Sequence, residues 1–240
     1  MAVANAIVNE LKCAVRARLI LRWATMSKHT KYSEHVSTEI DTRVQENLKV
    51  LRSIAGDTGY KAECVSAGAV PALVSLMSSS KGDEAECAVG AVWRIALGDA
   101  ACKEACVSAG AVPALVSLLS SSKGNETQWA AGALANIAWG DAARVAACVS
   151  AGAVPALVSL MSSRKDTDAE CAAVSLWSMA KGDAACKAAC VSAGAVPVLV
   201  SLLSSSRAVA KNYAQELLTD IAKYSPEYGQ LVINAGFNPV

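Results

Sequence analysis

The chain has 240 residues, of which 53% are apolar but only 5% aromatic, and its formal net charge is +1. A chain without a basic excess has no global electrostatic basis for binding nucleic acid or an anionic membrane surface. With so few aromatic side chains, the core must be built from Ala, Val, Leu and Cys, whose small size lets helices approach closely.

Residues 1–40 do not share the pattern of the rest of the chain. Residues 4–26 are predicted to form one helix with an apolar stripe at a spacing of four, made of Ile7, Leu11, Val15 and Leu19. We interpret it as a helix that caps the open end of the fold that follows. Its basic, acid-poor composition leaves two alternatives open, a mitochondrial transit segment and a membrane-surface helix.

Three further expectations concern the same region. The first apolar stretch, residues 2–8, is short and has no charged start, so no secretory signal is predicted. Residues 27–37 are polar and are predicted to form a loop. His29 and His35 are weak evidence for a metal site, because no cysteine or carboxylate cluster accompanies them.

A repeat organises the remainder of the chain. The string Cys-Val-Ser-Ala-Gly-Ala-Val-Pro begins at Cys64, Cys106, Cys148 and Cys190, and the differences 106−64, 148−106 and 190−148 all equal 42. A fixed period of this size is typical of stacked repeat architectures. We therefore expect residues 41–240 to form one repeat array, with units at about 41–56 (partial), 57–98, 99–140, 141–182, 183–224 and 225–240 (partial).

Each unit is predicted to contain three helices. In the unit that starts at residue 99, residues 99–110 form the first helix, with Asp99 as N-cap and Gly110 as left-handed C-cap. Residues 112–121 form the second, because proline is tolerated in a first helical turn, where its missing N–H has no partner. Residues 126–139 form the third, capped by Asn125.

These units resemble the armadillo repeat. The resemblance rests on the corner Ala109-Gly-Ala-Val-Pro113, the apolar triplet Leu115, Leu118 and Leu119, and the run Ala133-Leu-Ala-Asn-Ile-Ala138. It implies an all-α, right-handed superhelix of about four to five three-helix repeats with an N-terminal capping helix. It also implies a concave groove, lined by the third helices, that binds extended peptides, and it implies no enzymatic activity.

The resemblance further implies that an asparagine near the end of each third helix bonds the peptide backbone, since an amide both donates and accepts. Only Asn136 matches, and Arg94, Ser178 and Asp220 stand at the equivalent positions. Helical periodicity places other side chains on the same face. The candidate groove residues are Trp129, Gly132, Asn136, Trp139, Arg94, Ser178, Lys181, Tyr213 and Asp220.

Two further expectations concern the tryptophans and the charge of that face. Trp93 and Trp177 lie one residue before the asparagine position, about 100° away around the helix, and are expected to pack between repeats. More basic than acidic residues are expected along the groove.

No catalytic, cofactor or metal site is predicted. The only histidines lie outside the repeat, and no phosphate-binding or nucleophile motif occurs. The cysteine pairs Cys102/Cys106 and Cys186/Cys190 are expected to be buried rather than to bind zinc. Buried free thiols indicate a reducing compartment, so the expected location is cytoplasmic or nuclear.

The expected function is a scaffold for a protein or extended peptide. Two alternatives remain: a repeat module that assembles with itself, as a homodimer or end to end, and a transport adaptor similar to importin alpha. Binding of nucleic acid is not expected. Stable membrane insertion is not expected either, because Gly110 and Pro113 interrupt the uncharged run at 105–122.

Overall fold

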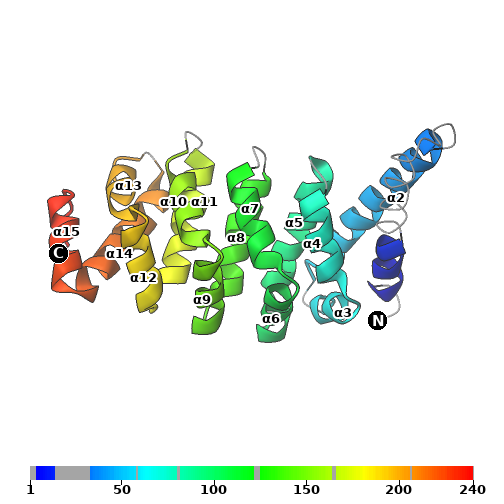
Figure 1. Cartoon of the computed structure of the whole chain (residues 1–240), viewed down its shortest axis with the longest axis horizontal. Coiled ribbons are helices and arrows are strands. Elements are labelled where there is room, and N and C mark those ends of the chain that lie inside the picture. The colour runs from blue at the N-terminus through cyan, green and yellow to red at the C-terminus, as the bar shows by residue number, and fades with distance from the viewer. Residues whose placement is uncertain are drawn as a thin grey trace. The chain divides into compact units, whose positions relative to one another are not determined.

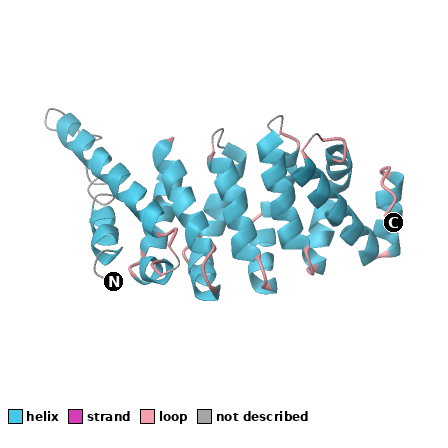
Figure 2. Cartoon of the chain, turned by 180° about the vertical axis from the view of Figure 1, so that it is seen from behind, coloured by secondary structure: helices cyan, strands magenta, loops and turns pink. Residues whose placement is uncertain are grey.

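The structure, a computed structural model, describes residues 4–13, 33–57, 59–79, 82–121, 125–163, 166–205 and 207–239. Every regular element in this part of the chain is an α-helix (Figure 2), which confirms the all-α class. The chain forms two compact units, residues 1–114 and 115–240. Each unit is described by itself.

The first unit begins with a helix over residues 4–13 (Figure 1). It continues with α2 (Ser33–Ile54), α3 (Lys61–Ser66), α4 (Ala69–Ser79), α5 (Asp83–Ala96), α6 (Ala100–Ser108) and the start of α7 (Ala111–Ser121). Helices α2 and α4 both pack against α5. The buried face of α2 carries Val44, Leu48 and Leu51, whose spacing of four and three residues places them on one side of the helix.

The helix over residues 4–13 packs through a different stripe from the one predicted. It buries Ala4, Val8 and Leu11, whereas Ile7 is only half-buried. The predicted stripe is therefore confirmed at Leu11 and wrong at Ile7, while Val15 and Leu19 lie outside the described residues. The Lys12 ammonium donates to the carbonyl of Ala67, the C-cap of α3. A cation is favourable at the end of a helix, where carbonyls have no partner within the helix.

Helix α2 begins earlier than the polar composition suggested. It starts at Ser33, so the loop predicted for residues 27–37 is wrong for residues 33–37. Residues 27–32 lie outside the described part. Polar residues can extend a helix beyond its packed region, because helix propensity depends little on a side chain's polarity.

The second unit contains the rest of α7, then α8 (Glu126–Ala138), α9 (Ala142–Ser150), α10 (Ala153–Met161) and α11 (Asp166–Ala180). It ends with α12 (Ala184–Ser192), α13 (Ala195–Leu202), α14 (Ala208–Tyr224) and α15 (Pro226–Asn234) (Figure 1). Within it, α11 packs on both α8 and α14, the third helices of the neighbouring repeats. The buried hydroxyl of Ser175 donates to the carbonyl of Ala131 at 2.8 Å, which ties α11 to α8.

One cap recurs at the start of each first helix. The side chains of Asp99, Asp141 and Asp183 accept a hydrogen bond from the backbone N–H three residues later, at 2.7–2.9 Å. Ser225 occupies the same place one repeat period after Asp183 and accepts from the Tyr228 N–H. Such a cap satisfies one of the unpaired N–H groups of the first turn.

The corner between first and second helices is also as predicted. Gly110 has φ = +76°, a left-handed conformation that costs a residue with a side chain more than it costs glycine. Asn125 stands at the predicted N-cap position of α8, but it does not cap the helix through its side chain. Its backbone is already helical, and its side chain makes no capping hydrogen bond.

Arg144 closes the end of α8. Its side chain is buried, its Nε donates to the Ile137 carbonyl at 2.7 Å, and its Nη2 donates to the Trp139 carbonyl at 3.3 Å. The equivalent residues in the neighbouring repeats are Cys102 and Cys186. Arginine at this one position therefore pairs helix-end carbonyls that a cysteine cannot reach.

Replacing Arg144 with alanine removes these bonds. We expect Arg144→Ala to lower the free energy of unfolding by about 1.5–3 kcal/mol, because hydrogen bonds from a charged donor are lost and a buried carbonyl is left unpaired. Urea denaturation measures the change. Arg43→Ala, at an exposed position on α2, is the control and should change the free energy by less than about 0.5 kcal/mol. Equal losses in both variants would contradict this role.

The cysteines lie largely in the core. Cys64, Cys102, Cys106, Cys148, Cys186 and Cys190 are buried, which confirms the expected burial of both pairs. Burial raises the pKa of the Cys106 and Cys148 thiols to about 12. Burial, followed by the hydrogen bond with Asp99, raises the pKa of Cys102 to about 11. Among the described residues, no group of three or more His, Cys, Asp or Glu residues is arranged to hold a metal ion.

These raised thiol pKa values predict a loss of stability in alkali. Well below pH 9, the ordinary pKa of a thiol, these cysteines are protonated in both the folded and the unfolded chain. Above pH 9 the unfolded chain loses thiol protons first, so the free energy of unfolding falls until about pH 12. The double variant Cys106→Ala/Cys148→Ala should fall less steeply between pH 8.5 and pH 11 in urea titrations. Cys13→Ala, at an exposed thiol, should follow the wild-type slope.

In the described part of the chain, no single helix has both the length and the apolar character needed to cross a membrane. The pairs α6/α7, α9/α10 and α12/α13 reach that length and composition only when taken together. They are bent by 73°, 72° and 87° respectively.

Candidate functional site

The candidate site lies on the face formed by α8, α11 and α14 in the second unit. These are the third helices of successive repeats, and α11 contacts the other two. Because each helix occupies the same place in its repeat, residues one repeat period apart stand at equivalent heights on neighbouring helices. Single side chains can therefore form continuous rows across the three helices.

A row of three aromatic rings also crosses these helices, although its members are not one repeat period apart, since 177−139 is 38 and 213−177 is 36. The rings of Trp139 and Trp177 have centroids 6.0 Å apart with an interplanar angle of 37°. Trp177 also meets Tyr213 edge-on, with centroids 4.9 Å apart. Both distances lie in the range in which aromatic pairs attract. Trp177 is thus the central member of a row of three rings, one contributed from each of the three helices or their ends.

The end of α8 determines the position of Trp139. This residue is the C-cap, and its ψ of 123° turns the chain out of the helix. Its carbonyl accepts from Arg144, and 45% of its surface remains exposed. An exposed indole of this size is a large apolar contact area that costs little conformational entropy to hold in place.

Lys181 adds a cation to the aromatic row. Its ammonium nitrogen lies 4.5 Å from the centroid of the Trp177 ring and 6.0 Å from that of Trp139. Lys181 follows Trp177 by four residues, so the two side chains share one face of the helical path. Cation–π attraction is effective up to about 6 Å.

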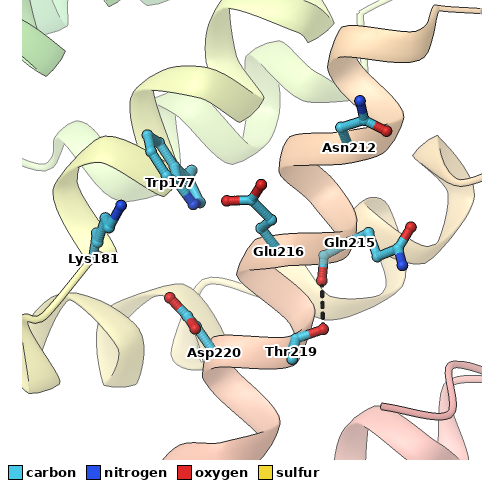
Figure 3. Close-up of a pocket in the computed structure, with 7 residues that line it drawn as sticks. All are labelled: Trp177, Lys181, Asn212, Gln215, Glu216, Thr219 and Asp220. Atoms are coloured by element: carbon cyan, nitrogen blue, oxygen red, sulfur yellow. Dashed lines mark hydrogen bonds between the residues drawn. The ribbon is translucent and has the colours of Figure 1, made fainter. Parts of the chain in front are cut away.

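Beside this row a cavity of about 440 Å³ opens between α11 and α14 (Figure 3). Helix α11 contributes Trp177, and Lys181 follows at its end. Helix α14 contributes five residues: Asn212, Gln215, Glu216, Thr219 and Asp220. Figure 3 shows the Glu216 carboxylate directed toward Trp177 and Asp220 on the side of Lys181. The cavity therefore has one aromatic wall and one polar wall.

The polar wall is acidic. Two carboxylates face one ammonium, so the lining carries one net negative charge. Within the described part of the chain, neither Glu216 nor Asp220 forms an ion pair. The sequence predicted an excess of basic residues along this face, and at the cavity the structure has the reverse. The prediction covered the whole groove, including Arg94, which does not line this cavity, whereas Glu216 and Asp220 both do.

The predicted groove residues divide into two groups. Lys181 and Asp220 line the cavity, while Tyr213 and Trp139 pack on its tryptophan. The others are half-buried on third helices and do not line it: Trp129, Gly132 and Asn136 on α8, Ser178 on α11, and Arg94 on α5 of the first unit. The structure therefore centres the candidate site on Trp177, one repeat further along the chain than the predicted centre at Trp129, Asn136 and Trp139.

Trp177 was the main residue that sequence reasoning missed. It was expected to pack between repeats, and it does contact rings from both neighbouring repeats. The same ring also lines the cavity, because an indole is long enough to reach a face that its Cβ does not point at. The sequence signal was the spacing of four between Trp177 and Lys181.

Comparisons with known proteins agree with the fold. Residues 99–139 match the sequence model of the Armadillo/beta-catenin-like repeat. A crystal structure of an engineered protein is 30% identical to this chain, covers 98% of this chain and 86% of its own, and has a TM-score of 0.82. A computationally designed armadillo repeat protein for modular peptide recognition is 28% identical, with 81% and 82% coverage and a TM-score of 0.77.

A third structure is a designed armadillo repeat protein in complex with the peptide (KR)4. It is 24% identical, covers 97% of this chain and 87% of its own, and has a TM-score of 0.80, a likeness of fold alone. No curated protein matches the chain. With the repeating three-helix units described above, these similarities show that the chain belongs to the armadillo repeat family.

Proposed function

We propose that this protein is a non-enzymatic scaffold that binds an extended peptide across the α8–α11–α14 face. A basic side chain of the peptide enters the cavity between α11 and α14. The observation that carries the proposal is the composition of that cavity, which combines a tryptophan wall with two carboxylates that form no ion pair among the described residues. An aliphatic stem packs on an indole while its charged end pairs with carboxylates.

Three further features support this proposal. The cavity volume of about 440 Å³ lies within the usual range for ligand pockets, about 300–1,000 Å³. Asn212 and Gln215 carry amides that donate and accept at once, as an extended peptide backbone requires. The exposed Trp139 extends the apolar contact area beyond the cavity.

The direct test is a titration with the peptide (KR)4. We expect the double variant Glu216→Gln/Asp220→Asn to bind it about three- to tenfold more weakly than wild type, because two partly exposed ion pairs are lost. The loss should shrink as salt rises from 50 mM to 500 mM, since exposed charges are screened. Fluorescence anisotropy of the labelled peptide gives the dissociation constants.

Glu227→Gln is the matched control, because it removes one exposed carboxylate from α15, outside the cavity. It should bind (KR)4 within twofold of wild type. An acidic octapeptide, (DE)4, should bind more weakly than (KR)4. Tighter binding of the acidic peptide, or equal weakening by Glu227→Gln, would reject the proposed chemistry.

Self-association stays a prediction. The side chains that could serve it are Leu231 and Ile233 on α15, which are 42% and 48% exposed. The transport-adaptor alternative also stays open, and the acidic cavity favours it more than the sequence did. Only the adaptor alternative uses the peptide site proposed above, so light scattering with and without (KR)4 separates self-association from peptide binding.

A further inference from the structure

Among the described residues that line the cavity, only Lys181 carries an ammonium group, and it already lies over the aromatic row. Its nitrogen is 4.5 Å from the Trp177 centroid and 6.0 Å from that of Trp139. Across the cavity, the carboxylates of Glu216 and Asp220 are beyond ion-pair distance of it. The cation therefore stacks on the rings rather than pairing with the acids.

That location is the one a ligand's basic side chain would take. Trp177 is the one aromatic residue among the described residues that line the cavity, and the part of its ring that faces the cavity is the surface on which an aliphatic stem would pack. An incoming ammonium or guanidinium would lie beside the Lys181 ammonium in a partly enclosed space. Like charges repel strongly at such distances, and more so where water is partly excluded.

We infer that Lys181 is an internal occupant of the cation site and limits the affinity for basic peptides. This inference rests on the proposed function, because it assigns a competitor to the same cavity. A basic ligand must displace the Lys181 side chain from Trp177 before its own stem can pack there. The exposed four-carbon stem of Lys181 permits this displacement, and Asp220 lies on the side toward which the ammonium can move (Figure 3).

The inference gives Lys181 a role opposite to that of an ordinary contact residue. If a lysine contacts the ligand, removing that lysine weakens the binding. A lysine that occupies the site in the free protein strengthens binding when it is replaced by a neutral side chain of similar length. Loss of its charge by acetylation would act in the same direction.

The test compares wild type, Lys181→Met and Lys223→Met in titrations with (KR)4. Methionine keeps the length of the stem and removes the charge. Lys223 is the equivalent residue of the next repeat, and it is exposed and lies outside the cavity lining. Among the described residues, Lys223 has no aromatic partner. Lys181→Met should bind about two- to fivefold more tightly than wild type, the effect of one exposed cation–π contact. Lys223→Met should stay within twofold.

A second measurement needs no ligand. In the free protein, the NMR signals of the Lys181 ε-methylene protons should be shifted upfield by the ring current of Trp177, whereas those of Lys223 should not. Binding of (KR)4 should move the Lys181 signals back toward ordinary values.

The outcomes separate the two proposals. If (KR)4 binds none of the three proteins, the proposed function fails and the inference fails with it. If wild type binds but Lys181→Met binds equally or more weakly, or if the Lys181 signals are unshifted in the free protein, the inference alone is overturned. Tighter binding by Lys181→Met only, with the shift present, supports it.

Discussion

The structure depends on one packing constraint. A repeat of three short helices has no interior of its own, so it must bury its third helix against the repeats on either side. Helix α11 shows this in the second unit, where it packs between α8 and α14. Ala172, Ala173 and Leu176 of this helix are fully buried. Small side chains at these positions let the third helices approach closely, as stacked repeats require. Polar bonds such as that from Ser175 to Ala131 then fix the register of the pair.

The candidate site follows from the same constraint. Once both flanks of a third helix are buried, only its remaining face is available to a ligand, and that face carries the same positions in every repeat. Substitutions at those positions then determine what the face binds. The position of Asp220 is filled by different side chains in other repeats, whereas Trp93 and Lys223 repeat the residue types of Trp177 and Lys181. It is the combination of Trp177, Lys181 and Asp220 on neighbouring helices that lines a cavity in the second unit. Arg144 shows that the corners between helices vary in the same way.

The fold could be predicted further than the site could. The constant repeat period, the Asp99 cap and the Gly110 corner depend on local sequence, so the sequence predicted them and the structure confirms them. The predictions were wrong at positions where tertiary packing, rather than local sequence, determines how a side chain is oriented. Val8 is fully buried whereas Ile7 is only half-buried, and Asn125 precedes α8 without a side-chain capping bond. The prediction for Trp177 used only the direction of its Cβ around the helix. That direction takes no account of the length of the indole or of its contacts with rings from neighbouring repeats.

The central claim is that the aromatic and acidic cavity between α11 and α14 holds a side chain of a bound peptide. The most direct measurement follows the indole N–H signals of the tryptophans during titration with (KR)4. The account predicts a large, saturable shift of the Trp177 signal at the same peptide concentrations that saturate binding. A Trp177 signal that stays in place while the peptide binds would contradict the account, since the peptide would then occupy another surface.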